Sequence, residues 1–308
     1  MSFPGSNPTK PLGGLPQLDP LPDDIDIFTF YQRVFCTSSK QAEDNNTSSV
    51  NWWYHGFVTI QGDGAPPMLM LEAHNLVSCR LRETNSDGEL KIDWVILVQF
   101  DDVYSDESST SIHNPLTGHT AETPIPFFHP PGTFTARRKS KSELSLLIER
   151  PGIPSYQGQI VAGVMPNDRG RVCLIQTQPQ QTSSSDGTNT YTQLTLMLTV
   201  SLSEARGDRN TTVGLPGCGV FWGFQHGPLN TLFGFDEGTY GEFRTQGKLV
   251  KGETGEAVVP RLWSRYKTDF PGFFDDEGAL SPDWDGLFSG RLKGDGLNTR
   301  VLRLDEIG

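Results

Sequence analysis

The segment TYTQLTLMLTVSL, from Thr190 to Leu202, decides the fold class because its apolar and polar residues alternate. Every second residue from Leu194 to Leu202 is a leucine or a valine, and most residues between them are Thr or Ser. A period of two is typical of a β-strand with one buried face. We therefore expect a strand here that packs one side against the core.

Similar short runs recur along most of the chain. They are WWYHGFVTI (52–60), MLMLEAHNLVSCRL (68–81), KIDWVILVQF (91–100), ELSLLIER (143–150), QIVAGVM (159–165), GRVCLIQT (170–177), CGVFWGFQH (218–226) and GEFRTQGKLV (241–250). The run at 91–100 is apolar on both faces, which predicts a central, fully covered strand. The 33 Gly and 22 Pro supply the many turns that such a chain needs.

A sheet with this many strands either closes into a barrel or splits into packed layers. Helical spacing of apolar residues is found only near residues 23–35 and 256–269. The sequence therefore predicts a mainly β protein: a single antiparallel β-barrel or strongly curved sheet, lipocalin-like in general shape, with helices near both termini. We expect a flexible N-terminal arm at 1–22, one barrel-like domain at 23–290 and a C-terminal tail at 291–308.

Charge and motifs narrow the function classes. The net charge of −12 disfavours nucleic acid, which requires clustered Lys and Arg. The one dense basic run, ARRKSK from Ala136 to Lys141, is interpreted as a solvated loop. No apolar segment resembles a signal peptide or a membrane span, so we expect a cytoplasmic protein, and a homodimer stays possible.

Nucleotide, flavin and metal motifs are absent from the sequence. There is no GxGxxG, no GxxxxGK[ST] and no GxSxG. The six histidines show neither HxH nor HxxxH spacing, so we expect no cofactor and no metal. The histidine-rich stretch HNPLTGHT, from His113 to Thr120, has the Asn-Pro and Thr-Gly chemistry of a tight turn.

Candidate catalytic side chains are Glu72, His74 and His226. Glu72 and His74 are two residues apart on a predicted strand, and therefore share a face. A carboxylate beside an imidazole suits acid–base catalysis, although a solvated outer face of a sheet would carry the same residues. His226 ends an aromatic strand face that includes Trp222, which could line a pocket or be plain core.

The candidate substrate-binding set has six residues. It consists of Trp53, Tyr54, Asp93, Trp94, His129 and Trp222. Asp93 interrupts an apolar strand, so it must be paired or face a cavity. We expect the whole set to be aimed at a common interior if the strand faces allow it, since one β-bulge turns a lining residue outward.

Several motifs in order resemble a bacterial and fungal family known as domain of unknown function 1838. They are DDIDIFTFYQRVF (23–35), NWWYHG (51–56), MLMLEAHN (68–75), NPLTGHTAETP (114–124) and VPRLWSRYKTDFPGFFDD (259–276), with Asp283 and Trp284 beyond. The similarity spans about residues 24–285. Two loops look like insertions, and the run 241–250 lacks an expected histidine. The resemblance implies a domain without implying a reaction.

Two functions from different classes fit these residues. The first is a cofactor-independent enzyme that binds a small apolar or polyketide-like molecule in a barrel cavity. It would catalyse a cyclisation, isomerisation or dehydration, as a cyclase, isomerase or lyase of secondary metabolite biosynthesis, by acid–base and positioning effects. The second is a non-catalytic small-molecule carrier or scaffold. Convergence of the polar residues in one pocket would favour the enzyme, and their dispersal over the surface would favour the carrier.

Overall fold

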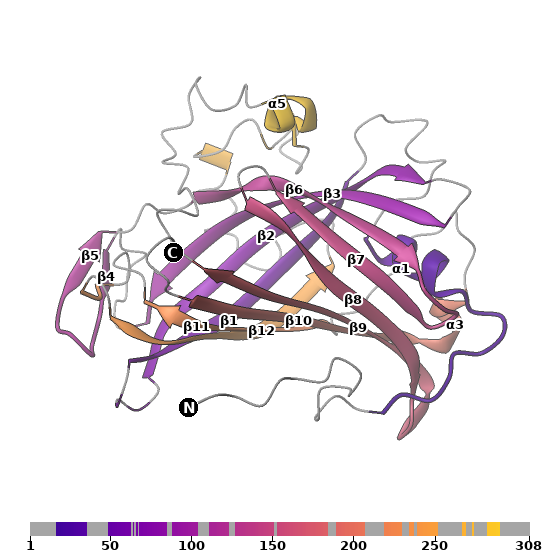
Figure 1. Ribbon diagram of the computed structural model, residues 1–308, viewed down its shortest axis with the longest axis horizontal. Helices are drawn as coiled ribbons and strands as arrows, with labels where there is room; N and C mark the ends of the chain where they lie inside the picture. The colour runs from indigo at the N-terminus through magenta and orange to yellow at the C-terminus, as the bar shows by residue number, and fades with distance from the viewer. Residues whose placement is uncertain are drawn as a thin grey trace.

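A computed structural model shows the chain as a β-barrel with a few short helices (Figure 1). The structure describes residues 17–35, 49–62, 64, 66, 68–84, 88–103, 111–122, 127–150, 153–183, 189–206, 219–229, 234–236, 239–251, 267–268, 273 and 282–289. All structural statements below concern these residues.

Ten strands of the described chain form one closed barrel, and every neighbouring pair is antiparallel. In their order around the wall they are β1 (Val50–Gly62), β12 (Tyr240–Lys251), β11 (Gly219–Pro228), β10 (Asn189–Ser201), β9 (Asp168–Ser183), β8 (Ile153–Met165), β7 (Glu143–Arg150), β6 (Phe127–Arg138), β3 (Glu89–Asp102) and β2 (Met68–Thr84). β1 and β12 close the barrel in a continuous register from Trp52↔Lys251 to Gly62↔Gly241. The predicted mainly β, antiparallel barrel is therefore confirmed.

A small hairpin outside the barrel contains the histidine-rich stretch. β4 (Ser111–His113) pairs with β5 (Thr120–Glu122) across a turn that begins at the buried Asn114. The Asn114 side chain accepts a hydrogen bond from the Leu116 amide at 2.8 Å, and Gly118 has a φ of 74°. The predicted tight turn is confirmed, and its two flanking histidines are exposed.

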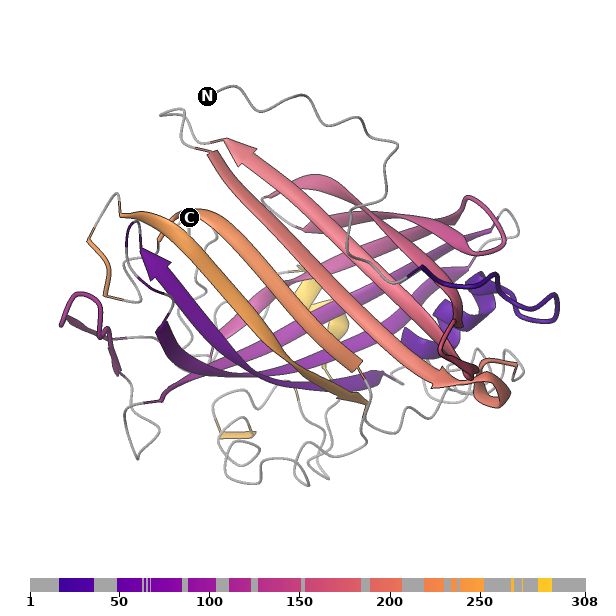
Figure 2. The same ribbon diagram turned by 90° about the horizontal axis from the view of Figure 1, so that it is seen from below.

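The described residues include the helices α1 (Ile27–Phe35), α3 (Leu202–Ala205) and α5 (Trp284–Ser289). α1 closes one end of the barrel, where Tyr31 donates a buried hydrogen bond to Gln176 on β9 at 3.0 Å (Figure 2). The predicted N-terminal helix is thus present, whereas most of the predicted helix at 256–269 lies outside the described residues. None of the described helices combines the length and apolar character that crossing a bilayer requires.

The structure describes only a small part of the two predicted end segments, 1–22 and 291–308. Residues 1–16 and 290–308 lie outside the described part. Within the predicted arm, Asp19 forms a β-bridge to Val164 on β8, and Leu21 is buried in the core. The last residues of the predicted arm therefore pack against the barrel wall.

Alternating residues separate the inner and outer faces of the wall. On β1, Trp52, Tyr54, Val58 and Ile60 belong to the main core cluster, whereas Phe57 on the other face is 41% exposed. The core also receives residues from α1, so the barrel interior is filled by side chains around this helix.

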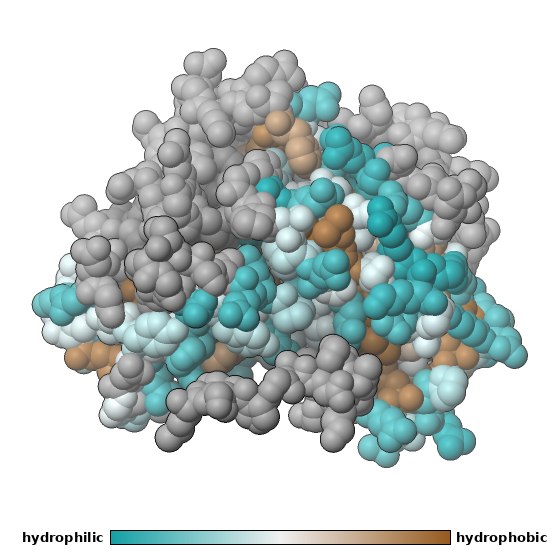
Figure 3. All heavy atoms as spheres, in the orientation of Figure 1, coloured by the Kyte–Doolittle hydropathy of each residue, from teal (hydrophilic) through white to brown (hydrophobic). Residues whose placement is uncertain are grey.

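The outer face of β1, β2 and β3 is also partly buried. Trp53, Leu76 and Leu97 point outward and are nevertheless at most 3% exposed. α5 packs over this wall, where Trp284 donates a hydrogen bond to Ser49 at 3.1 Å. The space-filling view shows apolar atoms at the surface in the position of α5, beside mostly polar described residues (Figure 3). The prediction that β3 is covered on both faces is confirmed.

Candidate functional site

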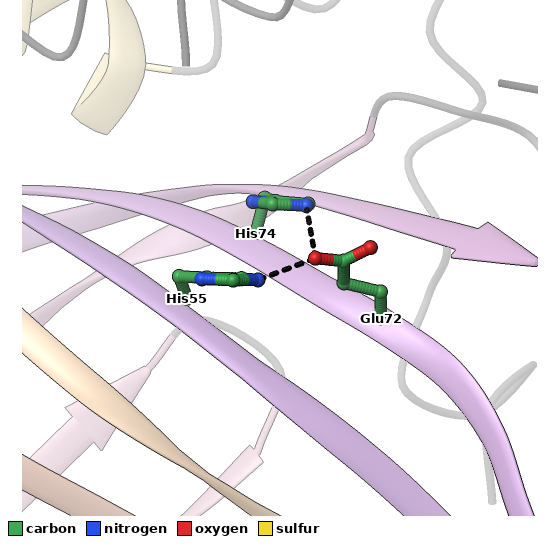
Figure 4. A group of neighbouring side chains, drawn as sticks. All are labelled: His55, Glu72 and His74. Carbon is green, nitrogen blue, oxygen red and sulfur yellow. Dashed lines mark hydrogen bonds and ion pairs between the residues drawn. The ribbon is translucent and has the colours of Figure 1, made fainter. Parts of the chain in front are cut away.

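The densest group of reactive side chains lies on the outer wall, on strands β1 and β2. His55 and His74 are directly opposite in the antiparallel register, and Glu72 is diagonal to His55 because it pairs with Phe57. Cross-strand neighbours have Cβ atoms about 4.5–5.5 Å apart, which brings the three side chains together. Figure 4 shows both imidazole rings ending at the Glu72 carboxylate.

The cluster has a defined geometry. His55 Nε2 is 2.5 Å from Glu72 Oε1, and His74 Nε2 is 3.7 Å from the same oxygen. The two rings are stacked, with centroids 4.6 Å apart and planes within 2° of parallel. One carboxylate oxygen therefore bridges two parallel imidazoles.

The solvent exposure of the three side chains increases from His74 to His55. The His74 side chain is 4% exposed, against 32% for Glu72 and 41% for His55. His74 Nε2 also lies 3.6 Å from Oδ2 of the buried Asp101, whose other oxygen accepts a hydrogen bond from Gln99 at 2.8 Å. The buried end of the cluster thus holds a second carboxylate, and the exposed end is accessible to a small molecule.

The same three residues could hold a divalent metal ion. Each of His55, Glu72 and His74 offers one donor atom, and these three atoms all lie within 4.8 Å of one another. Imidazole nitrogen and carboxylate oxygen are ligands for zinc and for non-haem iron. The lone pair of an imidazole lies in the ring plane, however, and two parallel planes do not meet. Coordination would require one ring to turn, and His55 is exposed enough to do so.

Asp93 belongs to a separate charge network on the outer face. It is fully buried, accepts a hydrogen bond from Thr133 at 2.9 Å, and lies 3.3 Å from Arg80 and 3.6 Å from Arg82. The expectation that a charge on a covered strand must be paired is met here by two arginines.

Tyr54 and Trp94 occupy the inner face of the wall. The Tyr54 hydroxyl is hydrogen-bonded to Thr245 at 2.6 Å, and its ring contacts Phe221 edge-on. Burial raises the pKa of Tyr54 to about 12, against the opposing effect of the Thr245 hydrogen bond. Trp94 stacks on Phe134 with centroids 5.2 Å apart. These two aromatic residues are therefore part of the packed core.

The remaining candidates are remote from the cluster or only partly described. Trp222 and His226 face outward on β11. The register across β2, β1, β12 and β11 places Trp222 level with Glu72, three strands away. His226 is four residues beyond Trp222, so it lies on the order of 20 Å from Glu72. It lies 4.0 Å from Glu242 and beside the Tyr240 ring. For His129, only the backbone is described, in β6 opposite Ile96.

The predicted set is therefore not aimed at one interior. Glu72, His74 and Trp53 are brought together, with ring centroids of Trp53 and His74 6.0 Å apart. Tyr54 and Trp94 face the opposite side of the same wall. Sequence reasoning missed His55 and Asp101 as partners, because the register that pairs β1 with β2 and β2 with β3 is a tertiary property.

A search for related proteins found no match to this chain among protein-family models, curated proteins or solved structures. The resemblance to domain of unknown function 1838 accordingly stays a prediction.

Proposed function

We propose that this protein is an enzyme that transfers protons within a small molecule at the His55–Glu72–His74 cluster on the outer wall of the barrel. The observation that carries this proposal is the bridging of two stacked imidazoles by one Glu72 oxygen. The β-barrel itself is compatible with a ligand-binding protein.

The cluster combines the groups that proton transfer requires. An imidazole has a free pKa of about 6.5 and can act as acid or base near neutral pH. Glu72 accepts the hydrogen bond of one imidazole and so sets which nitrogen of that ring is free. His55, the exposed imidazole, would take a proton from a carbon or hydroxyl of the substrate and return it at another atom, and Glu72 would stabilise the protonated ring. The buried His74 would hold the Glu72 carboxylate in place. An isomerisation or cyclisation then conserves all atoms, and a dehydration releases one water molecule.

An exposed aromatic side chain flanks the accessible end of the cluster and favours a substrate with an apolar part. The Phe57 ring is 41% exposed and lies 5.7 Å from the His55 ring. Trp53 is buried and packs against His74 at the other end. A polyketide-like or other conjugated molecule would place its flat body against the Phe57 ring and its acidic proton at His55.

The test is conversion of a natural substrate pool by the purified protein. An extract of cells that lack the gene is incubated with wild-type protein, Glu72→Gln or Glu143→Gln, and the metabolites are compared by mass spectrometry. We expect a product with wild type and with Glu143→Gln, a surface control, and a loss of about 10²-fold or more with Glu72→Gln. Equal conversion by Glu72→Gln would contradict the proposal, and binding of a metabolite without conversion would favour a carrier.

The second candidate function is a metal-dependent reaction at the same residues, favoured by the convergence of three donor atoms. A bound divalent ion would supply Lewis-acid chemistry, and His55, Glu72 and His74 would hold it. The same incubation separates the two functions. Conversion that survives EDTA supports proton transfer by the side chains, whereas conversion that EDTA abolishes and zinc restores supports the metal centre.

A further inference from the structure

A second potential site lies about six residues along the same wall from the His55–Glu72–His74 cluster, on the order of 20 Å away. It is a cavity of about 420 Å³ beside β3, β6 and β7, and Phe288 of α5 contributes to its lining. This volume is in the range of small-molecule sites, about 300–1,000 Å³.

The chemistry of the lining is mainly cationic. Arg82, Lys91 and Arg150 line the cavity, together with one acidic residue, Glu149. Arg82 is 3.6 Å from Asp93, and Lys91 is 3.5 Å from a Glu89 oxygen. Two of the three cations thus already have a carboxylate partner.

Arg150 differs from the other two cations. Among the described residues no carboxylate lies within ion-pair distance of it, and its Nε is buried without a hydrogen-bond partner. Its guanidinium lies over the Trp94 ring, 4.2 Å from the centroid. Burial lowers the pKa of Arg150, which the nearby Tyr156 partly opposes. A partly buried guanidinium is costly unless an anion pairs with it.

The local backbone keeps the space beside Arg150 open. β6 and β7 pair only as far as Thr133↔Glu149, although β6 continues to Phe127. Gly132 is the residue of β6 just beyond this last pair. It has no side chain, and a Cβ there would meet the Trp94 ring at 2.6 Å. Trp94 can therefore lie against the strand and contact one face of the Arg150 guanidinium at the edge of the wall, where Arg150 also lines the cavity.

We propose that this cavity binds a small organic carboxylate with a flat apolar body. The fork of Arg150 suits two parallel hydrogen bonds to a carboxylate, and Arg82 and Lys91 add positive potential at the mouth. Phe288 provides an aromatic surface for the apolar part, and Arg82 already lies over its ring at 5.6 Å. The site is independent of the cluster on β1 and β2, so it can be tested without knowledge of the reaction.

Isothermal titration with 2-naphthoate and its neutral analogue 2-naphthamide tests the proposal. We expect wild type to bind the carboxylate at least about tenfold more tightly than the amide, because only the carboxylate pairs with the guanidinium. Arg150→Met should remove this preference, and its melting temperature should not fall, because a partly buried charge without a carboxylate partner is lost. Arg169→Gln, at an exposed position near the β8–β9 turn, controls for net charge and should leave binding unchanged.

Glu149→Gln gives a second measurement that does not depend on a variant of Arg150. Glu149 is exposed, so this variant should fold, and the loss of its negative charge should tighten 2-naphthoate binding about two- to threefold. The proposal is overturned if wild type does not prefer the carboxylate, or if Arg150→Met binds it as tightly as wild type does. Should Arg150→Met fail to fold, unchanged affinity in Glu149→Gln overturns the proposal and tighter binding supports it.

Discussion

Tyr54 lies flat across two glycines that face each other on neighbouring strands. Gly56 of β1 pairs with Gly247 of β12, and a Cβ at either position would penetrate the Tyr54 side chain or a backbone carbonyl. At Gly247 the nearest atoms would be the His55 carbonyl oxygen at 2.3 Å, the Gly56 Cα at 2.5 Å and a Tyr54 ring carbon at 2.6 Å. These glycines are required for close approach of an aromatic ring to the strand, since neither has a positive φ.

Gly247→Ala should therefore destabilise the barrel by about 3 kcal/mol, at the upper end for overpacking. Gly62→Ala is the matched control on β1, because no atom lies within 4 Å of its added Cβ. Its effect should stay within about 0.5 kcal/mol. Urea unfolding followed by tryptophan fluorescence measures both values, and equal effects would show that the Tyr54 contact does not matter.

The candidate site shows how far single residues could be interpreted from the sequence. The spacing of Glu72 and His74 placed both on one strand face, and the structure keeps them together. Whether that face was inner or outer could not be predicted, because β1, β2 and β3 bury apolar residues on both sides. His55 was visible on the Trp53 face of its strand, but only the cross-strand register makes it a partner of His74.

At the scale of elements, the least predictable strand was β6. Its sequence FFHPPGTFTARR contains Pro130, Pro131 and Gly132, which are typical of a turn, and its end was interpreted as a basic loop. The register shows why a strand tolerates them: Trp94 pairs with Gly132 and Ile96 with His129, so both prolines lie at a bulge. A bulge does not require the N–H donor that proline lacks.

Asp26, the residue just before helix α1, connects the helix to strand β6. The Asp26 carboxylate accepts a hydrogen bond from the Thr29 amide at 3.1 Å, as a helix N-cap does, and another from Arg138 Nη2 of β6 at 3.0 Å. Burial raises the pKa of Asp26, but the hydrogen bonds of Arg138 and Thr29 outweigh it and lower the pKa to about 2. The barrel end and its helix are thus joined through an ionised carboxylate.

This depressed pKa makes stability depend on pH in a defined window. Above 3.8, the ordinary pKa of an aspartate side chain, the carboxylate is charged in both folded and unfolded chains, and its contribution is complete. As the pH falls from 3.8 to about 2, the unfolded chain takes up a proton that the folded chain does not, so stability is lost. Asp26→Asn keeps the cap but not the charge. Its melting temperature should fall below that of wild type at pH 6 and converge with it towards pH 2.

Arg138→Gln removes the other partner and should show the same convergence. A difference between wild type and Asp26→Asn that does not change between pH 6 and pH 2 would mean that the carboxylate charge does not contribute to stability.

At the scale of the whole molecule, alternation along the chain was enough to predict a barrel. Strands such as β10 show a clear period of two in their sequence. Many connections between successive strands are short and rich in turn residues, which favours antiparallel pairing of neighbours. What alternation could not predict is that the outer wall over β1–β3 would be covered as well. That covering involves Trp284 and Leu287, more than 180 residues from β3 in the chain, and such long-range contacts leave no local pattern.

The covering of the outer wall should be coupled to the barrel as one cooperative unit. Trp284 is 2% exposed, donates a hydrogen bond to Ser49 just before β1, and stacks beneath the Arg80 guanidinium of β2 at 4.9 Å. Trp284→Ala removes all three contacts and should lower the free energy of unfolding by about 3–5 kcal/mol. Trp222→Ala, which truncates a half-buried tryptophan on the outer face of β11, should lower the free energy of unfolding by less than half as much.

Thermal unfolding followed by far-ultraviolet circular dichroism reports the strands, so a lower midpoint for Trp284→Ala would show that the C-terminal covering stabilises the barrel. An unchanged midpoint would show instead that the barrel is stable without it, and that α5 is an independent lid over the wall that carries both the cluster and the cavity.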